Sequence, residues 1–273
     1  MTKSRIQEIS IALLISMTGG ILPSFADTPS SDIELATASP AVVRVSGDVI
    51  YYEGDFSEPS TKAFKAAISG IKRGQLTRLV ISSGGGATGE GREIGSWVHD
   101  MSLIVEVEGI CFSSCANYVF PAGSAKVIRK NAFVGWHGNE RGFVNKAQHQ
   151  GETIESLFRK SMPPELLKLS SEVADEKVSA AVDFFRKSIP EEAKFYAMLG
   201  LNDAFSMCAV GDAATAKYPN LNDKKGWGFT VDDMTRLGLK NITYQGYGAY
   251  ETSPLFVKYL GLLSADDCLS LLK

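Results

Sequence analysis

Short apolar runs alternate with helical repeats along the first half of the chain. The runs typical of β-strands are Ala41 to Gly47, Asp48 to Gly54, Leu76 to Ser82 and Leu103 to Val107. Between them, Pro59 to Ile71 and Gly91 to Met101 carry apolar residues at helical spacing. In the run Leu79-Val-Ile no polar residue alternates, as expected of a strand covered on both faces. Because strands that alternate with helices are joined by parallel crossovers, this order predicts an α/β fold.

The second half shows a weaker pattern. A helix is predicted to open at Ser113 to Val119, followed by strands at Val127-Ile128 and Ala132 to Trp136 and a polar loop at Asn139 to Gly151. A long helix at Glu165 to Ser188, which Pro190 interrupts, precedes a further helix at Glu191 to Leu199. The last predicted elements are a loop at Tyr218 to Gly228, a short helix at Val231 to Leu237 and a helical cap at Leu255 to Leu272 broken at Gly261.

The N-terminus has the pattern of an export signal. Lys3 and Arg5 precede a mostly apolar run, and Ser24-Phe-Ala26 places small residues where a signal peptidase cleaves. We therefore expect a signal peptide at 1–26, a flexible lead at 27–40, an α/β domain at 41–245 and a C-terminal cap at 246–273. The alternative is an uncleaved anchor helix, but the run is short for a membrane span and Gly19-Gly20 breaks it. Export places the mature chain in a periplasm or outside the cell.

Composition narrows the classes of partner and raises the question of disulfides. The net charge is −3, without a long basic run, which disfavours a nucleic-acid partner. The chain has 4 cysteines, namely Cys111, Cys115, Cys208 and Cys268. In an oxidising compartment an even number favours up to two disulfides, and the sequence leaves the three pairings open. A bridge between Cys111 and Cys115 would brace the turn between them.

Three motifs carry the residue types of an acyl-transfer site. They are Leu79-Val-Ile-Ser-Ser-Gly-Gly-Gly-Ala-Thr-Gly-Glu-Gly, Glu108-Gly-Ile-Cys-Phe-Ser-Ser-Cys and Ala132-Phe-Val-Gly-Trp-His-Gly. A glycine-rich turn before a helix presents backbone N–H groups that suit an oxyanion or a phosphate. A serine at a tight turn and a histidine at a strand end supply a nucleophile and a base.

Each motif also has a structural interpretation. The glycine stretch could be a plain tight turn. Ser113 could be a helix N-cap, Ser114 could fill either role, and a lone histidine at a strand end is usually structural. Cys111, Cys115 and His137 have the residue types of a zinc site, but their spacing matches no compact zinc pattern. We expect no metal and no cofactor.

Taken together, the motifs resemble the Clp-protease/crotonase superfamily, in particular exported Clp-like serine protease homologues. The resemblance covers roughly Leu76 to Gly138, with a weaker similarity at Trp227 to Ile242. The glycine turn resembles the oxyanion loop of Clp proteases, with Gly84 where that family usually has Pro. His137 stands 24 positions after Ser113 (137 − 113), close to the family's separation of nucleophile and base.

The resemblance implies a Clp/crotonase-like spiral of ββα units with a helical C-terminal part, and a serine-type peptidase as the activity. Ser113 would be the nucleophile and His137 its general base, with the N–H groups of Gly85 and Ser114 as the oxyanion hole. Counting back from Gly123 favours Ser114 as the nucleophile instead. A peptide or protein would be the substrate, and superfamily members commonly assemble into homo-oligomers.

The position of the third member of the triad stays open. The family's Asp would align near Gly226, and Asp223 is the nearest acidic residue, with Asp203 and Asp212 further away. A water or a Ser–His dyad could replace it. Two rival functions follow: an inactive Clp-like protein that binds a partner in the same cleft, and an acyl-CoA enzyme of the crotonase type, which export and the lack of a basic cluster disfavour.

Overall fold

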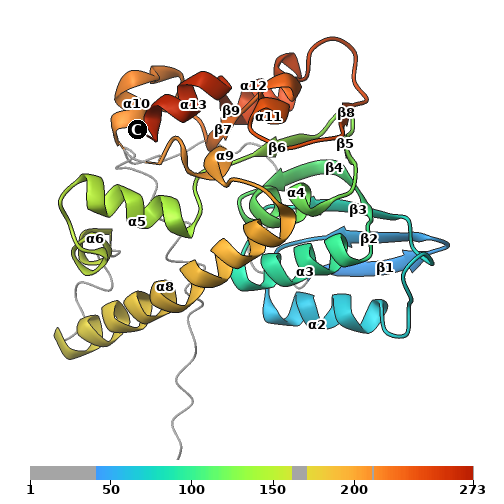
Figure 1. Cartoon of the computed structure of the whole chain (residues 1–273), viewed down its shortest axis with the longest axis horizontal. Coiled ribbons are helices and arrows are strands. Elements are labelled where there is room, and N and C mark those ends of the chain that lie inside the picture. Colours follow the sequence, from blue (N-terminus) through green and yellow to red (C-terminus); the bar gives the residue numbers. More distant parts are fainter. Residues whose placement is uncertain (1–40, 162–170, 211, 273) are drawn as a thin grey trace, which may run out of the picture.

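The computed structural model describes residues 41–161, 171–210 and 212–272 (Figure 1). The predicted signal peptide and flexible lead lie outside the described residues, and so does the predicted start of the long helix at Glu165. Within the described ranges, no helix is both long and apolar enough to cross a membrane.

A mainly parallel sheet forms the centre of the molecule. Its strands in spatial order are β1 (Val42–Ser46), β2 (Val49–Glu53), β3 (Arg78–Ser83), β4 (Ile104–Phe112), β5 (Lys126–Ile128) and β8 (Ile242–Tyr244), while β6 (Phe133–Gly135) pairs with the second half of β4. Only the β1–β2 pair among these is antiparallel. This topology confirms the predicted α/β class and the parallel crossovers.

Two helices make the crossovers on one face of this sheet (Figure 1). Helix α2 (Glu58–Ala67) connects β2 to β3, and α3 (Thr88–Asp100) connects β3 to β4. The middle residues of β3, Leu79, Val80 and Ile81, are all buried, which confirms that this strand is covered on both faces.

Two glycines bring α3 against the segment that follows β4. That segment is a short π-helix, η1 (Cys115–Val119), which continues into α4 (Phe120–Ala122). A Cβ on Gly95 would lie 2.6 Å from the carbonyl oxygen of Tyr118, and one on Gly91 would lie 3.2 Å from Cβ of Ser114. Because Gly91 and Gly95 are four residues apart, they share one face of α3 and allow a close helix–helix approach.

The polar loop predicted at Asn139 to Gly151 is wrong, because Glu140–His149 forms helix α5. The side chain of Asn139 caps it by accepting a hydrogen bond from the N–H of Gly142 at 2.8 Å. Phe143 and Ala147, four residues apart, are buried against α6 (Ile154–Ser161) and α8 (Ser171–Leu199). The apolar side of α5 is thus covered by other helices, which the polar local sequence does not reveal.

Helix α8 runs unbroken through Pro190, so the predicted interruption is also wrong. Tertiary packing explains the continuity. Phe185 is buried in the cluster with α5 and α6, and Phe195 is buried in the main core, so both halves of the helix are anchored. In Figure 1 the first half of α8 extends away from the sheet with α5 and α6, and the second half crosses next to α3.

The remaining elements form the helical C-terminal part. They are α9 (Ala204–Met207), α10 (Asp212–Lys217), η2 (Pro219–Leu221), β7 (Gly226–Gly228), α11 (Val231–Arg236), η3 (Tyr250–Thr252), α12 (Pro254–Tyr259), β9 (Leu260–Leu262) and α13 (Ala265–Leu271).

The predicted short helix is present as α11, but two other predictions here are wrong in part. Gly261, expected to break a helix, lies in β9, which pairs with β7 inside the predicted loop. A Cβ on Gly261 would lie 2.4 Å from the side chain of Leu221, so a glycine is needed for this close approach. The C-terminal part also contacts the main sheet, because the hydroxyl of Tyr250 in η3 accepts a hydrogen bond from the N–H of Val134 in β6 at 2.7 Å.

Candidate active site

Ser113 sits in the tight turn between β4 and the π-helix. Its φ is +56°, in the left-handed region that non-glycine residues rarely adopt. Its N–H donates to the carbonyl of Gly135 at 3.2 Å, and its own carbonyl accepts from the N–H of Asn117 at 2.8 Å. Strained residues of this kind persist where the surroundings hold them, and they cluster at active sites.

His137 lies beside this serine. The Oγ of Ser113 and the Nε2 of His137 are 2.7 Å apart and hydrogen-bonded. The pairing of strands explains the proximity: β4 and β6 run parallel with Phe112 opposite Gly135, so the residues that follow both strands emerge at the same edge of the sheet. The ring of Phe112 stacks on the imidazole with centroids 5.1 Å apart.

The geometry separates the two neighbouring serines. Ser114 is buried, and its hydroxyl donates to the carbonyl of Gly86 at 2.7 Å. Ser113 is half-exposed and its hydroxyl contacts the histidine. This arrangement favours Ser113 over Ser114 as the nucleophile and gives the Ser114 side chain the task of fixing the glycine loop.

The glycine loop packs directly on the serine turn. Gly85 and Gly86 have φ of +108° and +119°, and a Cβ on Gly85 would lie 2.6 Å from Cβ of Ser113. In the described part of the chain, the N–H of Ser114 has no acceptor, as is usual in a first helical turn. The N–H of Gly85 donates to the hydroxyl of Ser83 at 3.1 Å. The two residues predicted as oxyanion donors therefore lie next to Ser113, and the N–H of one of them, Gly85, already donates to Ser83.

Burial controls the protonation of the base. Removal from solvent lowers the pKa of His137 from 6.5 to about 4, although its own backbone acts in the opposite direction. The imidazole is consequently neutral at neutral pH, which is the form that accepts a proton from a serine hydroxyl.

The predicted acid is not brought to the histidine. Among the carboxylates whose side chains the structure describes, none has an oxygen within 4.0 Å of a His137 ring nitrogen. Asp223 is exposed in the turn after η2. Asp203 is buried but binds the side chains of Asn139 and Arg141, at 3.2 Å and 2.8 Å. The side chain of Asp212 lies outside the described residues.

Several residues that sequence reasoning missed hold the three motifs together. Asn117 of the π-helix donates its amide to the carbonyl of Gly138, next to the histidine, at 2.9 Å. Glu140 follows His137 by three residues and accepts from Arg92 of α3 at 3.0 Å and from the hydroxyl of Thr88. This buried ion pair ties the histidine segment to the helix that follows the glycine loop. Asn117 lies one helical turn after Ser113, a spacing that could have indicated it.

The cysteines settle another open alternative. The disulfides are Cys111–Cys115 and Cys208–Cys268. Because zinc is bound by free thiolates, the bridge between Cys111 and Cys115 excludes the zinc site considered from the sequence.

Comparison with known proteins finds weak structural similarities. No protein-family model matches the chain, and no curated protein matches it. Solved structures of Clp-protease and crotonase type are similar to it at low identity. The topology itself confirms the α/β class with a helical C-terminal part.

Three of these structures illustrate the degree of likeness. A ClpP1 mutant from Listeria monocytogenes has 15% identity and a TM-score of 0.30, over 42% of this chain and 80% of that one. Methylmalonyl CoA decarboxylase complexed with 2S-carboxypropyl CoA has 12% identity and a TM-score of 0.29, over 60% and 82%. Pseudomonas aeruginosa DspI has 11% identity and a TM-score of 0.28, over 38% and 54%.

The chain spans 48% of a second methylmalonyl CoA decarboxylase structure and 54% of DspI, about half the length of these proteins. Scores and identities of this size carry no information about activity, which has to be argued from the site.

Proposed function

We propose that the protein is a serine hydrolase of the peptidase kind, acting through an acyl-enzyme on Ser113. The observation that carries the proposal is the 2.7 Å contact between the hydroxyl of Ser113, in its left-handed turn, and the Nε2 of His137. Nucleophile and base within hydrogen-bond distance, beside backbone donors, are the parts that acyl transfer requires.

The geometry supports a defined sequence of proton transfers. As the Oγ of Ser113 attacks a substrate carbonyl, its proton passes to Nε2 of His137, and the carbonyl oxygen becomes an oxyanion beside the N–H of Ser114. His137 then gives the proton to the leaving amine, which departs and leaves the acyl group bonded to Ser113. In the second half, water attacks the acyl carbonyl and gives a proton to His137. His137 passes this proton to the Oγ of Ser113 as the ester bond breaks, which releases the acid and restores the serine hydroxyl.

The N–H of Gly85, the second predicted oxyanion donor, has to change its acceptor before it can bind an oxyanion. The N–H of Gly85 is shared with the hydroxyl of Ser83, whereas an oxyanion is a stronger acceptor than a neutral hydroxyl. Charge developing on the substrate oxygen would therefore draw this N–H away from Ser83. The donor would act mainly in the transition state, where stabilisation accelerates the reaction.

Labelling with a fluorophosphonate tests the proposal. We expect the mature wild-type protein to form a covalent adduct that peptide mapping places on Ser113. Ser113→Ala should lose the adduct, while Ser114→Ala, which keeps the backbone N–H, should still be labelled. A folded wild-type protein that forms no adduct, or an adduct that persists in Ser113→Ala, would refute the assignment.

One observation favours a second function. Because no described carboxylate orients His137, and a misoriented histidine loses most activity, the surface around Ser113 would in this alternative bind a peptide or protein partner without turning it over. In that case a peptide aldehyde, which needs an activated serine for its covalent bond, would bind no more tightly than the matched alcohol.

We also propose that the protein works in an exported, oxidising compartment. Two disulfides in the described part of the chain and the signal-like pattern before Ala26 support this location. The mass of the protein isolated from its cell envelope should correspond to a chain beginning at Asp27, and a chain that still begins at Met1 would contradict cleavage.

A further inference from the structure

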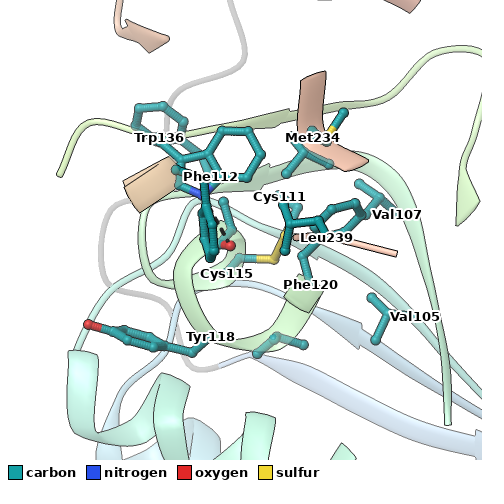
Figure 2. Packing of buried hydrophobic residues seen from close by; sticks show 14 of the residues in the cluster. Val105, Val107, Cys111, Phe112, Cys115, Tyr118, Phe120, Trp136, Met234 and Leu239 are labelled. Carbon is teal, nitrogen blue, oxygen red and sulfur yellow. Dashed lines mark hydrogen bonds between the residues drawn. A yellow bond between two sulfur atoms is a disulfide. The ribbon is translucent and has the colours of Figure 1, made fainter. Parts of the chain in front are cut away.

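One disulfide spans the proposed nucleophile. Cys111 is the last residue but one of β4, Cys115 is the first residue of the π-helix, and their Cα atoms are 5.1 Å apart. The bridge therefore closes a small ring over Phe112, Ser113 and Ser114. Both cysteines are fully buried, and Figure 2 shows the bond between their sulfur atoms inside the apolar cluster.

Loop length separates the effect of this bridge from that of the other one. In the chain-entropy account, a disulfide stabilises a fold more when it closes a longer loop. The sequence separation is 4 residues for Cys111–Cys115 and 60 residues for Cys208–Cys268. The short bridge therefore adds less to global stability than the long one, and the effect that distinguishes it is on the local geometry of the turn.

The turn between the two cysteines needs such a constraint. Ser113 is held at a φ of +56°, which an L-residue leaves unless its neighbours prevent it. Two free thiol sulfurs cannot stay at bonding distance, and the surrounding core, which contains Phe120 and Leu239, is closely packed. Breaking the bridge would consequently push the ends of the turn apart and move the hydroxyl of Ser113 relative to His137.

We propose that the Cys111–Cys115 disulfide is a positioning element that holds Ser113 in its reactive conformation, so that reduction of this bridge switches the nucleophile off. This inference rests on the proposed serine hydrolase function. The reductant is a dithiol. One of its thiolates attacks a sulfur of the bridge to form a mixed disulfide, and its second thiol then displaces the remaining cysteine. Two electrons and two protons pass to the protein, which gains two thiols, while the dithiol becomes a cyclic disulfide.

The experiment uses a variant that carries only this bridge. In Cys208→Ala/Cys268→Ala, fluorophosphonate labelling of Ser113 is timed before reduction, after reduction by dithiothreitol and after reoxidation. Alkylation and mass spectrometry confirm the state of both remaining cysteines, and circular dichroism follows the fold. A displacement of about 1 Å at an active site can cost about 100-fold in rate, so we expect a loss of this order that reoxidation reverses.

The matched control is the reciprocal variant, Cys111→Ala/Cys115→Ala, which keeps the distant bridge. It should be folded and labelled as slowly as the reduced protein. An unchanged labelling rate in the fully reduced, folded protein would overturn the inference while leaving the proposed function intact. Unfolding on reduction would also overturn it, because the bridge would then be a global stabiliser. Absence of labelling in the oxidised wild type would instead refute the proposed function, on which this inference depends.

Discussion

Ser113 and His137 are each held in a state that an isolated residue would avoid. The serine occupies a costly backbone conformation, and the histidine is partly removed from the solvent that would stabilise its charged form. Both features are useful for acyl transfer, since the first exposes the hydroxyl at the turn and the second keeps the base unprotonated. The stacked ring of Phe112 restricts the imidazole where a carboxylate would otherwise orient it.

The pH dependence of labelling tests the state of His137. Because desolvation lowers its pKa to about 4, the imidazole is mostly unprotonated above that value and stays able to accept a proton through the mildly acidic range. We expect the labelling rate to fall along an acid limb centred at about pH 4. The ordinary histidine value is 6.5. A limb centred at that ordinary value, in protein shown to be folded by circular dichroism, would contradict the buried neutral state.

The contact between Ser113 and His137 was predictable from sequence, whereas the positions of the acidic residues were not. Each follows the end of a strand, and parallel strands bring such residues to one edge, so sequence spacing carries the information. Distance along the chain indicates Asp223, but the position of an acid in the structure depends on how a later segment packs. The burial of Asp203 with Arg141 depends in the same way on tertiary contacts that no local pattern encodes.

At the scale of elements, the π-helix connects nucleophile to base. Its residue Asn117 donates to the carbonyl of Gly138, and this hydrogen bond joins the segment after Ser113 to the segment after His137. Asn117→Ala should slow labelling of Ser113 and lower the free energy of unfolding by only about 1 kcal/mol, the usual net value of a hydrogen bond.

Asn220→Ala is the matched control, because it removes the same type of bond, to the carbonyl of Leu262, in the C-terminal part. It should leave the labelling rate as in the wild type. If both variants slowed labelling equally, the effect of Asn117 would be general loosening and the connection would not be specific.

Helix α8 contributes a buried carboxylate whose titration can be measured. Glu192 accepts hydrogen bonds from the hydroxyl of Tyr118 at 2.6 Å and the N–H of Arg141 at 3.1 Å. Burial, and then the nearby Glu140, raise the pKa of Glu192 from 4.5 to about 7. Between these values the folded protein binds more protons than the unfolded chain, so stability falls as pH rises, by up to about 3 kcal/mol from this group.

Glu192→Gln removes this titration. We expect the Tm of the wild type to fall relative to that of the variant between about pH 5 and about pH 8, as measured by scanning calorimetry. A Tm difference that is constant over the range would show that Glu192 is ionised throughout.

The same helices show why the second half of the fold was harder to predict. Helix α5 is polar in composition, and its few apolar residues are buried only because α6 and α8 cover them, which the local sequence does not indicate. Pro190 is tolerated because the flanking turns of α8 are anchored in two separate clusters. In the first half, by contrast, each strand and crossover helix carries its own apolar pattern, and the predicted and observed elements agree closely.

At the scale of the whole molecule, Cys208–Cys268 ties α9 to α13. The segments it joins are far apart in sequence, and α13 also packs on α11, which follows β7 beside the histidine strand. Closing a loop of this length restricts the unfolded chain far more than it changes the folded one. We therefore expect the Cys208–Cys268 bridge to raise the free energy of unfolding without changing the reactivity of Ser113.

Equilibrium unfolding in urea separates the two bridges. From loop lengths set by their separations of 60 and 4 residues, the chain-entropy relation gives about 4 kcal/mol for Cys208–Cys268 and about 2 kcal/mol for Cys111–Cys115. Cys208→Ala/Cys268→Ala should thus lose about twice as much unfolding free energy as Cys111→Ala/Cys115→Ala, yet keep the wild-type labelling rate at temperatures where it is folded. A bridge with a local effect must change the unfolding free energy and the labelling rate unequally. If both variants lost the two quantities in the same proportion, labelling would simply follow stability and the distinction between the bridges would be wrong.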